Sequence, residues 1–263
     1  MGVQLGQEIE RFFSQLRRSR SSVLLLDYDG TLAPFSTDRG SARPYNGVPR
    51  LVQMIMANGK TRVVLVSGRP AKEVRSLLGI TPPPEIWGMH GLQRFRPDGR
   101  CEMAELTTSE KSAIAKARSW LKSQGLWKQA ETKPASIAVH WRGLPSAIAE
   151  EIQRKVTTAW IPLASLGNMS LLEFDGGIEL RPARGNKGQA VFVIMKEVAI
   201  GVPIAYLGDD ATDEDAFRAL AYRGLTVLVR PEWRETSAKV WIRPPRELLT
   251  FFENWLRCLR SVG

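Results

Sequence analysis

Short runs of apolar residues, rich in β-branched side chains, recur along the chain at residues 23–26, 62–66, 203–207 and 225–229. None of them alternates strictly between apolar and polar positions, as a strand with one face in water would. Each run is therefore expected to be a strand that is buried on both faces. Strands of this kind form parallel sheets that are covered by helices.

Helical segments separate these strands, as the crossover connections of a parallel sheet require. Glycine ends the segments at residues 48–59, 67–79 and 185–201, and Pro70 lies near the start of the second, which are favoured positions for these residues at helix ends. The alternation of strands and helices predicts an α/β fold with a doubly wound, Rossmann-like parallel sheet.

Between residues 105 and 181 the pattern changes. The expected elements are a helix at 108–125, strands at 127–133 and 136–142, a helix at 145–160, and strands at 168–175 and 177–182 that form a hairpin turning at Gly176 and Gly177. This order is typical of an α+β module with antiparallel strands and helices on one face. We therefore expect two domains. Residues 1–104 and 182–263 form the α/β core, and residues 105–181 form a module inserted into it.

The composition indicates an ordinary globular protein. The chain has 263 residues, 43% of them hydrophobic, and no stretch approaches the ~18–20 apolar residues that a membrane span needs. The first twenty residues lack the apolar region of a signal peptide. Cys101 and Cys258 lie far apart, with no Cys/His set nearby that would indicate a disulfide framework or a zinc site. We expect a cytoplasmic protein without a membrane partner.

The net charge of +10 raises the question of nucleic-acid binding. The basic residues are spread along the chain, and no helix-turn-helix, zinc finger or RNP-type motif accompanies them, so we expect no nucleic-acid partner. Residues 38–75 carry eight Lys/Arg against two acids. A positive field over this segment would equally attract a small anion such as a phosphate ester.

The first apolar run ends on two acids. Adjacent strand residues point to opposite faces, so Asp27 and Asp29 share a side while Tyr28 turns away, and Gly30 allows a tight turn. Two like charges this close need a cation. Mg²⁺, which prefers carboxylate, phosphate and water oxygens, would supply it.

A second acidic group lies in "GDDATDEDAF", residues 208–217. Asp209, directly after a strand and a glycine, is the first candidate for a metal ligand, and Asp213 is the next, either directly or through water. The alternative for Asp213 to Asp215 is the first turn of a helix, where acids are favourable.

Two further polar residues follow strands or precede helices. Ser67 ends the second strand in "VSGRP", where its hydroxyl and the following N–H groups would bind an anion, although Ser-Gly-Arg alone is more often a turn. Lys187 lies in "RGNKGQA" at a helix start, where a lone lysine is usually a surface charge. The spacing of a P-loop is absent, and no G-x-G-x-x-G follows the first strand, which argues against nucleotide binding.

Together, "DYDGT", "SGR", "NKG" and "GDDATDE" resemble, in this order, the four motifs of the haloacid dehalogenase superfamily of phosphatases. The position of the inserted module resembles that superfamily's C2-type cap. The stretches "WGMHG", "ETKPASIAVHWR", "GGIELRPARGNKG" and "YLGDDATDEDAF" are similar to the trehalose-6-phosphate phosphatase family in particular. The resemblance covers about residues 22–260, with one departure: Gln93 stands near a place where these phosphatases often carry an acid.

The resemblance implies Mg²⁺-dependent hydrolysis of trehalose 6-phosphate. Asp27 attacks phosphorus and forms an aspartyl-phosphate, Asp29 is the general acid and base, and Mg²⁺, Lys187 and Ser67 stabilise charge on the transferred group. The expected metal ligands are Asp27, Asp29, Asp209 and Asp213. The expected substrate contacts are Gly30, Thr31, Gly68, Arg69, His90, Glu131, Lys133, Arg142, Glu179 and Arg181.

Alternatives remain open at this point. The charged residues of the inserted module can form cross-strand salt bridges on a solvated face instead of binding sugar, and His90 and His140 can be structural. The substrate can be another sugar phosphate, such as sucrose 6-phosphate, glucosylglycerol phosphate or a mannosylglycerate-type phosphate. A receiver-like module that uses an aspartate without turnover is the non-enzyme alternative. We expect a small-molecule sugar phosphate as the partner, and a monomer.

Overall fold

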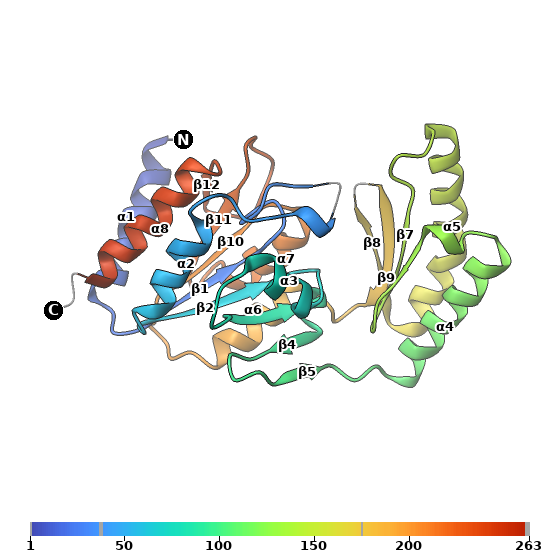
Figure 1. The fold of residues 1–263 in the computed structure, drawn as a ribbon, viewed down its shortest axis with the longest axis horizontal. Coiled ribbons are helices and arrows are strands. Elements are labelled where there is room, and N and C mark those ends of the chain that lie inside the picture. The colour runs from blue at the N-terminus through green and yellow to red at the C-terminus, as the bar shows by residue number, and fades with distance from the viewer. Residues whose placement is uncertain (1, 37–38, 175, 261–263) are drawn as a thin grey trace. The chain divides into compact units, whose positions relative to one another are not determined.

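The structure is a computed structural model that describes residues 2–36, 39–174 and 176–260. The chain divides into two compact units, a core unit of Met1–Met103 with Asn186–Gly263 and an inserted unit of Ala104–Gly185. Each unit has its own sheet (Figure 1). Among the described residues, no helix combines the length and the hydropathy needed to cross a membrane.

Eight strands form the sheet of the core unit in the described part of the chain, in the order β12-β11-β10-β1-β2-β3-β4-β5. The pairs from β12 to β3 are all parallel, whereas β4 pairs antiparallel with both β3 and β5. Their bounds are β1 (Ser22–Leu26), β2 (Thr61–Val66), β3 (Glu85–Gly88), β4 (Gln93–Phe95), β5 (Cys101–Met103), β10 (Ile204–Gly208), β11 (Leu225–Val229) and β12 (Val240–Ile242).

Helices cover both faces of this sheet, and successive residues of β1 point to opposite faces. Leu24 and Leu26 pack under one layer of helices, and Val23 and Leu25 pack under the other. The first layer contains α1 (Gly2–Arg18), α2 (Val48–Ala57), α3 (Ala71–Leu78) and α8 (Arg246–Arg260), and the second contains α6 (Lys187–Lys196) and α7 (Glu214–Leu220). The expectation of a doubly wound α/β core is thereby confirmed.

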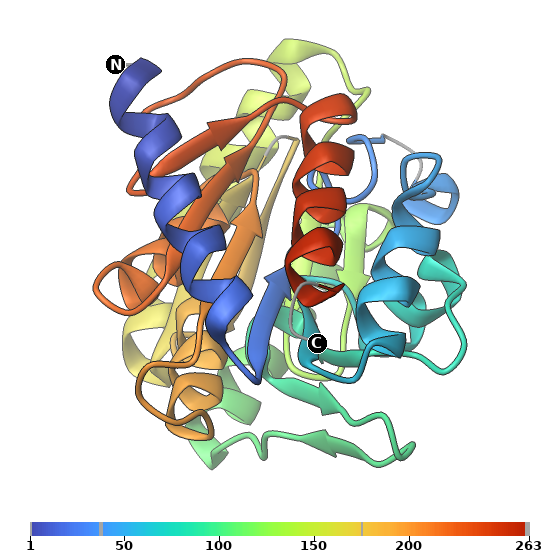
Figure 2. The same ribbon diagram turned by 90° about the vertical axis from the view of Figure 1, so that its left-hand side faces the viewer.

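The first layer of helices faces the viewer in Figure 2, with α1 in blue and α8 in red. The rings of Phe12 in α1 and Trp255 in α8 lie 5.5 Å apart, so the first and last helices of the described chain close this face of the core together. Both side chains are buried.

The four apolar runs predicted as strands are β1, β2, β10 and β11. Two helices end before the glycines that were expected to terminate them. Helix α2 ends at Ala57, two residues before Gly59, and α6 ends at Lys196, five residues before Gly201. At its start, α6 is capped by Asn186, whose side-chain oxygen accepts a hydrogen bond from the N–H of Gln189 at 2.8 Å.

The inserted unit contains an antiparallel sheet of four strands among the described residues, in the order β6-β7-β9-β8. Ile137, Val139, Ile178 and Leu180 pack against the two helices on one face, as expected. The elements are α4 (Thr108–Ser123), β6 (Ala130–Thr132), β7 (Ile137–His140), α5 (Ser146–Gly167), β8 (Met169–Phe174) and β9 (Gly177–Pro182).

Two element boundaries in the inserted unit differ from expectation. Residues Trp127–Gln129, expected in a strand, form a 3₁₀ turn before β6. Helix α5 continues through Pro162 to Gly167 instead of ending near Trp160. Packing of Trp160 against the sheet anchors the helix just before the proline, and the helix ends where Asn168 adopts a left-handed conformation.

Candidate active site

The site begins at the centre of the core sheet. Strand β1 lies between β10 and β2, and the three run parallel, so their carboxyl ends meet at one edge. Asp27, Ser67 and Asp209 follow these three strands directly. The edge outside the carboxyl ends of parallel strands is where α/β sheets bind their ligands.

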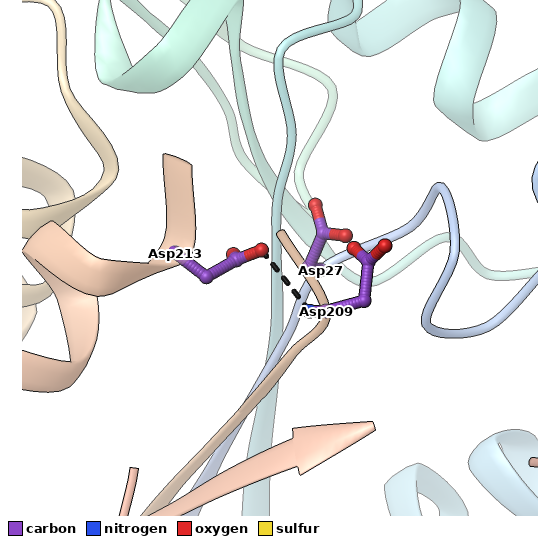
Figure 3. Close-up of side chains that lie close together, drawn as sticks. All are labelled: Asp27, Asp209 and Asp213. Carbon is purple, nitrogen blue, oxygen red and sulfur yellow. Dashed lines mark hydrogen bonds between the residues drawn. The ribbon is translucent and has the colours of Figure 1, made fainter. Parts of the chain in front are cut away.

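Three carboxylates gather at this edge (Figure 3). Among the described residues, Asp27, Asp209 and Asp213 are the group that can hold a metal ion, with one oxygen from each lying within 4.8 Å of the others. All three side chains are buried. Lys187 joins them, with its Nζ atom 2.6 Å from Asp27 Oδ1 and 2.7 Å from Asp213 Oδ1. Lys187 is thus a buried member of the site and not a surface charge.

Asp213 is fully engaged by hydrogen-bond donors. Its Oδ1 accepts from Lys187 and from the hydroxyl of Tyr206 at 2.6 Å, and its Oδ2 accepts from the N–H groups of Asp209 at 3.1 Å and Asp210 at 3.0 Å. A carboxylate offers about four lone-pair sites, so these bonds occupy the side chain. Its carboxylate closes the turn after β10 and aims Lys187 at Asp27.

Glycine is required at two positions around the acids. Gly30 has a left-handed φ of +79°, and a Cβ atom there would lie 1.9 Å from Asp209 Oδ2. A Cβ atom on Gly208 would lie 2.4 Å from the Cγ of Asp213. The absence of these two side chains gives the carboxylates their space, and the turn expected at Gly30 is present.

Burial shapes the charge of the site. It raises the pKa of Asp27 to about 7, an effect that Lys187 opposes and Asp213 reinforces. Burial, and then the negative charge of Asp27, raises the pKa of Asp209 well above its ordinary value. Burial alone would lower the pKa of Lys187, but Asp213 and Asp27 outweigh it, so the lysine stays charged.

These residues fit a hard divalent cation. With all groups ionised, three carboxylates and one ammonium leave a charge of −2 in a buried space. Asp209 receives no hydrogen bond on its carboxylate from the described residues, and Asp27 Oδ2 receives one, from the Thr31 hydroxyl at 3.2 Å. Oxygen-rich sites of this charge suit Mg²⁺. Asp27 and Asp209 have the open lone pairs, whereas Asp213 can serve an ion only through water.

Asp29 lies outside this cluster of three. Its carboxylate accepts hydrogen bonds from Arg69 Nε at 2.6 Å and Arg69 Nη2 at 2.7 Å. Arg69 also pairs with Glu73 on α3, a partner that the sequence did not indicate. The structure therefore brings Asp29 and Arg69 together directly.

Ser67 and His90 are buried near the carboxyl end of β2. The Ser67 hydroxyl accepts a hydrogen bond from the N–H of Arg69 at 3.1 Å, and the Ser67 carbonyl accepts one from the N–H of His90 at 2.9 Å. A Cβ atom on Gly68 would lie 2.6 Å from His90 Nε2, so the imidazole ring packs against the glycine. The "SGR" and "MHG" segments thus form one packed layer.

Three of the polar residues expected in the inserted unit, Glu131, Glu179 and Arg181, share the sheet face that points away from its helices. Glu131 and Glu179 lie on either side of Ala138 in the register of β6, β7 and β9. Lys133 Nζ lies 2.9 Å from Glu179 Oε1, and this pair is buried, unlike the solvated salt bridges of the alternative reading. Arg181, on the same strand, is also buried.

Two other residues complete this picture of the inserted unit. Glu131 Oε2 lies 2.8 Å from His140 Nε2, which makes His140 part of the polar face. Arg142 packs beside the hairpin turn, where a Cβ atom on Gly176 would lie 2.7 Å from the Cβ of Arg142. The i, i+9 relation of Glu131 and His140 gives no periodic signal in a sequence, because it depends on the β6–β7 pairing.

Comparison with known proteins gives one consistent family. The family model described as trehalose-phosphatase matches residues 25–239. The trehalose-phosphate phosphatase of Mycobacterium leprae is 29% identical over 270 residues, covering 93% of this chain and 59% of the relative. Trehalose-phosphate phosphatase B of Arabidopsis thaliana is 27% identical, covering 94% of this chain and 69% of that protein. The chain thus spans about three fifths to two thirds of the length of these relatives.

Solved structures agree with the fold. The C-terminal domain of C. albicans trehalose-6-phosphate phosphatase has a TM-score of 0.78 at 20% identity, covering 95% of this chain and 96% of that one. A haloacid dehalogenase-like hydrolase from B. subtilis has a TM-score of 0.62 at 15% identity, covering 89% of this chain and 98% of that one.

We predict that Mg²⁺ raises the melting temperature more at pH 8 than at pH 6. With its raised pKa, Asp27 binds a proton in the native state that the unfolded chain has already lost, so its contribution to the stability of the metal-free protein falls as pH rises from about 4 to 7. The raised pKa of Asp209 acts in the same direction. At pH 6 a proton on Asp27 competes with the cation, and at pH 8 this competition is weaker. Each kcal/mol of bound-ion stabilisation should add about 2–4 °C.

Scanning fluorimetry with and without Mg²⁺ at both pH values measures this difference. Asp209→Asn should reduce the Mg²⁺ shift strongly, and Asp98→Asn, at a half-exposed position in another turn of the core unit, should not. An equal shift at both pH values, or an unchanged shift in Asp209→Asn, would contradict this reading of the cluster.

Proposed function

The chain belongs to the trehalose-phosphatase family, and we propose that it is a Mg²⁺-dependent phosphatase that hydrolyses trehalose 6-phosphate to trehalose and phosphate. The observation that carries the proposal is the buried Asp27, paired with Lys187 and adjacent to Asp209 at the central strand end. A buried, oriented carboxylate in a site that suits a cation is what nucleophilic phosphoryl transfer needs. The names of the curated relatives support the choice of sugar.

In the first step, Asp27 attacks the phosphorus atom and the bond from phosphorus to the sugar oxygen breaks. Lys187 holds one oxygen of Asp27 and Thr31 holds the other, so the carboxylate is already oriented for attack. Asp29 gives its proton to the departing sugar oxygen. The products are the free sugar and an acyl phosphate on Asp27.

In the second step, Asp29 takes a proton from water, the water oxygen bonds to phosphorus, and the bond from phosphorus to Asp27 breaks. Inorganic phosphate leaves, and both aspartates return to their starting states. Lys187, the Ser67 hydroxyl and nearby N–H groups stabilise the charge of the transferred group. When Mg²⁺ is bound, held by Asp27 and Asp209, it adds positive charge at the phosphoryl oxygens.

We assign selection of the sugar to the polar face of the inserted unit, and phosphate chemistry to the core unit. Glu131, Glu179 and Arg181 lie on that face, and Lys133 is paired with Glu179. Carboxylates accept hydrogen bonds and guanidinium and ammonium groups donate them, which suits a disaccharide with many hydroxyls. Buried polar groups reject a wrong sugar because they would lose their partners.

The remaining expectations concern the setting of the reaction. We propose that the enzyme works as a monomer, since Asp27, Asp29, Lys187 and Asp209 all come from one chain. The thiols of Cys101 and Cys258 are free, which fits a reducing compartment such as the cytoplasm.

A screen of phosphate release across sugar phosphates tests the proposed substrate. Trehalose 6-phosphate should have a kcat/KM at least tenfold above that of sucrose 6-phosphate, glucosylglycerol phosphate and a mannosylglycerate-type phosphate. The comparison measures inorganic phosphate under multiple turnover. Preference for another sugar would reassign the substrate, and a single turnover without release would favour a receiver-like module.

Asp27→Asn should abolish the covalent intermediate and lower turnover by three or more decades, which is about 4 kcal/mol at ~1.36 kcal/mol per decade. The amide is a poor nucleophile and cannot form the acyl phosphate. Labelled substrate, acid quench and counting of protein-bound phosphate measure the intermediate. Label retained by Asp27→Asn would show that the nucleophile is a different residue.

Glu131→Ala or Glu179→Ala should lower kcat/KM for trehalose 6-phosphate by about 1–3 kcal/mol per lost polar contact. Neither change should slow a small aryl phosphate, because it has no sugar to bind. Glu173→Ala, an exposed position on β8 that faces the other side of the sheet, is the control. Equal losses on both substrates would point to misfolding, and no loss on either would leave these residues as structural salt bridges.

A further inference from the structure

The guanidinium group of Arg69 binds the carboxylate of Asp29, the proposed general acid and base. The Arg69 side chain is 3% exposed, whereas the Asp29 side chain that it binds is 34% exposed. Nε and Nη2 donate to the two different oxygens of Asp29, at 2.6 and 2.7 Å. This is a two-point contact, which defines both the position and the plane of the carboxylate.

The guanidinium is held in place independently of Asp29. The N–H of Arg69 donates to Ser67 Oγ at 3.1 Å, and its carbonyl accepts from the N–H of Met89 at 2.9 Å. Its Nη1 donates to Glu73, in the first turn of α3. Arg69 is thus built into the packed layer after β2, while Asp29 stands on the turn after β1. Contacts other than Asp29 hold Arg69 in place, and Arg69 in turn orients the carboxylate of Asp29.

We propose that Arg69 is a positioning residue that holds the Asp29 carboxylate in its working orientation for proton transfer, an assignment that rests on the proposed function. Each carboxylate oxygen has two lone pairs, and the contact with Arg69 uses one on each. One lone pair on each oxygen stays available to carry or accept a proton. Without the two-point contact, the carboxylate could rotate and would present its proton to the substrate only part of the time.

This role differs from the substrate contact expected for Arg69 from the sequence. All three nitrogens of its guanidinium are engaged with carboxylates, Nε and Nη2 with Asp29 and Nη1 with Glu73. A lysine cannot reproduce the contact, because its ammonium is a point charge without the planar fork.

The test separates proton transfer from phosphoryl transfer. With 2,4-dinitrophenyl phosphate, the leaving group departs without a proton, so Arg69→Gln and Arg69→Lys should phosphorylate Asp27 within about threefold of the wild-type rate. Hydrolysis of that intermediate needs Asp29, and general base catalysis is worth ~10²–10⁴. The variants should therefore show a burst of dinitrophenolate, then a steady-state rate at least tenfold below wild type, with phosphate retained on the protein.

A double variant makes the test specific. If Arg69 acts through Asp29, adding Arg69→Gln to Asp29→Asn should slow hydrolysis of the intermediate by less than twofold further. Lys72→Gln is the matched control, because it removes a positive charge from an exposed position at the start of α3. This variant should have wild-type rates and should show no burst. The burst itself shows that a variant is folded and can bind phosphate.

Two results would overturn the role of Arg69 and leave the proposed function intact, provided that the wild-type protein turns over substrate. One is an Arg69→Gln variant with wild-type rates. The other is a variant whose burst slows as much as its steady-state rate, which would make Arg69 a phosphate ligand. A wild-type chain that takes up no phosphate from either substrate overturns the proposed function and this assignment together.

Discussion

The buried ion pairs of Lys187 with Asp27 and Asp213 are the interaction on which the site depends. They join β1, α6 and the turn after β10, three segments that are distant in sequence. Taking one ammonium and several carboxylates out of water is unfavourable unless each finds partners. Here each charged group has partners. Tyr206 and two backbone N–H groups donate hydrogen bonds to Asp213, and Asp213 and Asp27 together form ion pairs with Lys187.

Asp27 and Asp209 receive fewer hydrogen bonds from the described residues than Asp213 does. Burial and the neighbouring acids raise the pKa values of Asp27 and Asp209, which favours protonation of these carboxylates when no cation is bound. The two glycines, Gly30 and Gly208, show how closely the backbone is drawn around the acids. A divalent cation bound between these carboxylates would neutralise the charge that burial makes unfavourable.

Local patterns were sufficient to predict the strands that carry the site. β1, β2, β10 and β11 are continuous apolar runs, and Asp27, Ser67 and Asp209 follow three of them directly, so their meeting at one edge followed from the parallel topology alone. Strands β3, β4, β5 and β12 escaped notice because three or four residues are too few to establish a period. Helix α5 passed through Pro162 because tertiary packing outweighed a local signal.

Partners across the chain could not be predicted in the same way. Arg69 and Asp29 are 40 residues apart, and Lys187 is 26 residues from Asp213, so neither pairing leaves a trace in local spacing. The role of Lys187 came from resemblance to a family, since a lone lysine at a helix start is usually exposed. The sequence pattern places Tyr206 among the apolar residues of a strand, although its hydroxyl donates a hydrogen bond to the carboxylate of Asp213.

The boundary between the two units falls between Gly185 and Asn186, immediately before Lys187. Asn186 belongs to the core unit and caps α6, so the helix that carries the lysine is closed off at the very residue where the chain enters the core. The cap fixes the start of α6 within the core unit, so the position of Lys187 depends on contacts inside that unit. Because Asn186, Asp27 and Asp213 all lie in the core unit, a change of the inserted unit leaves the residues that hold Lys187 unaltered.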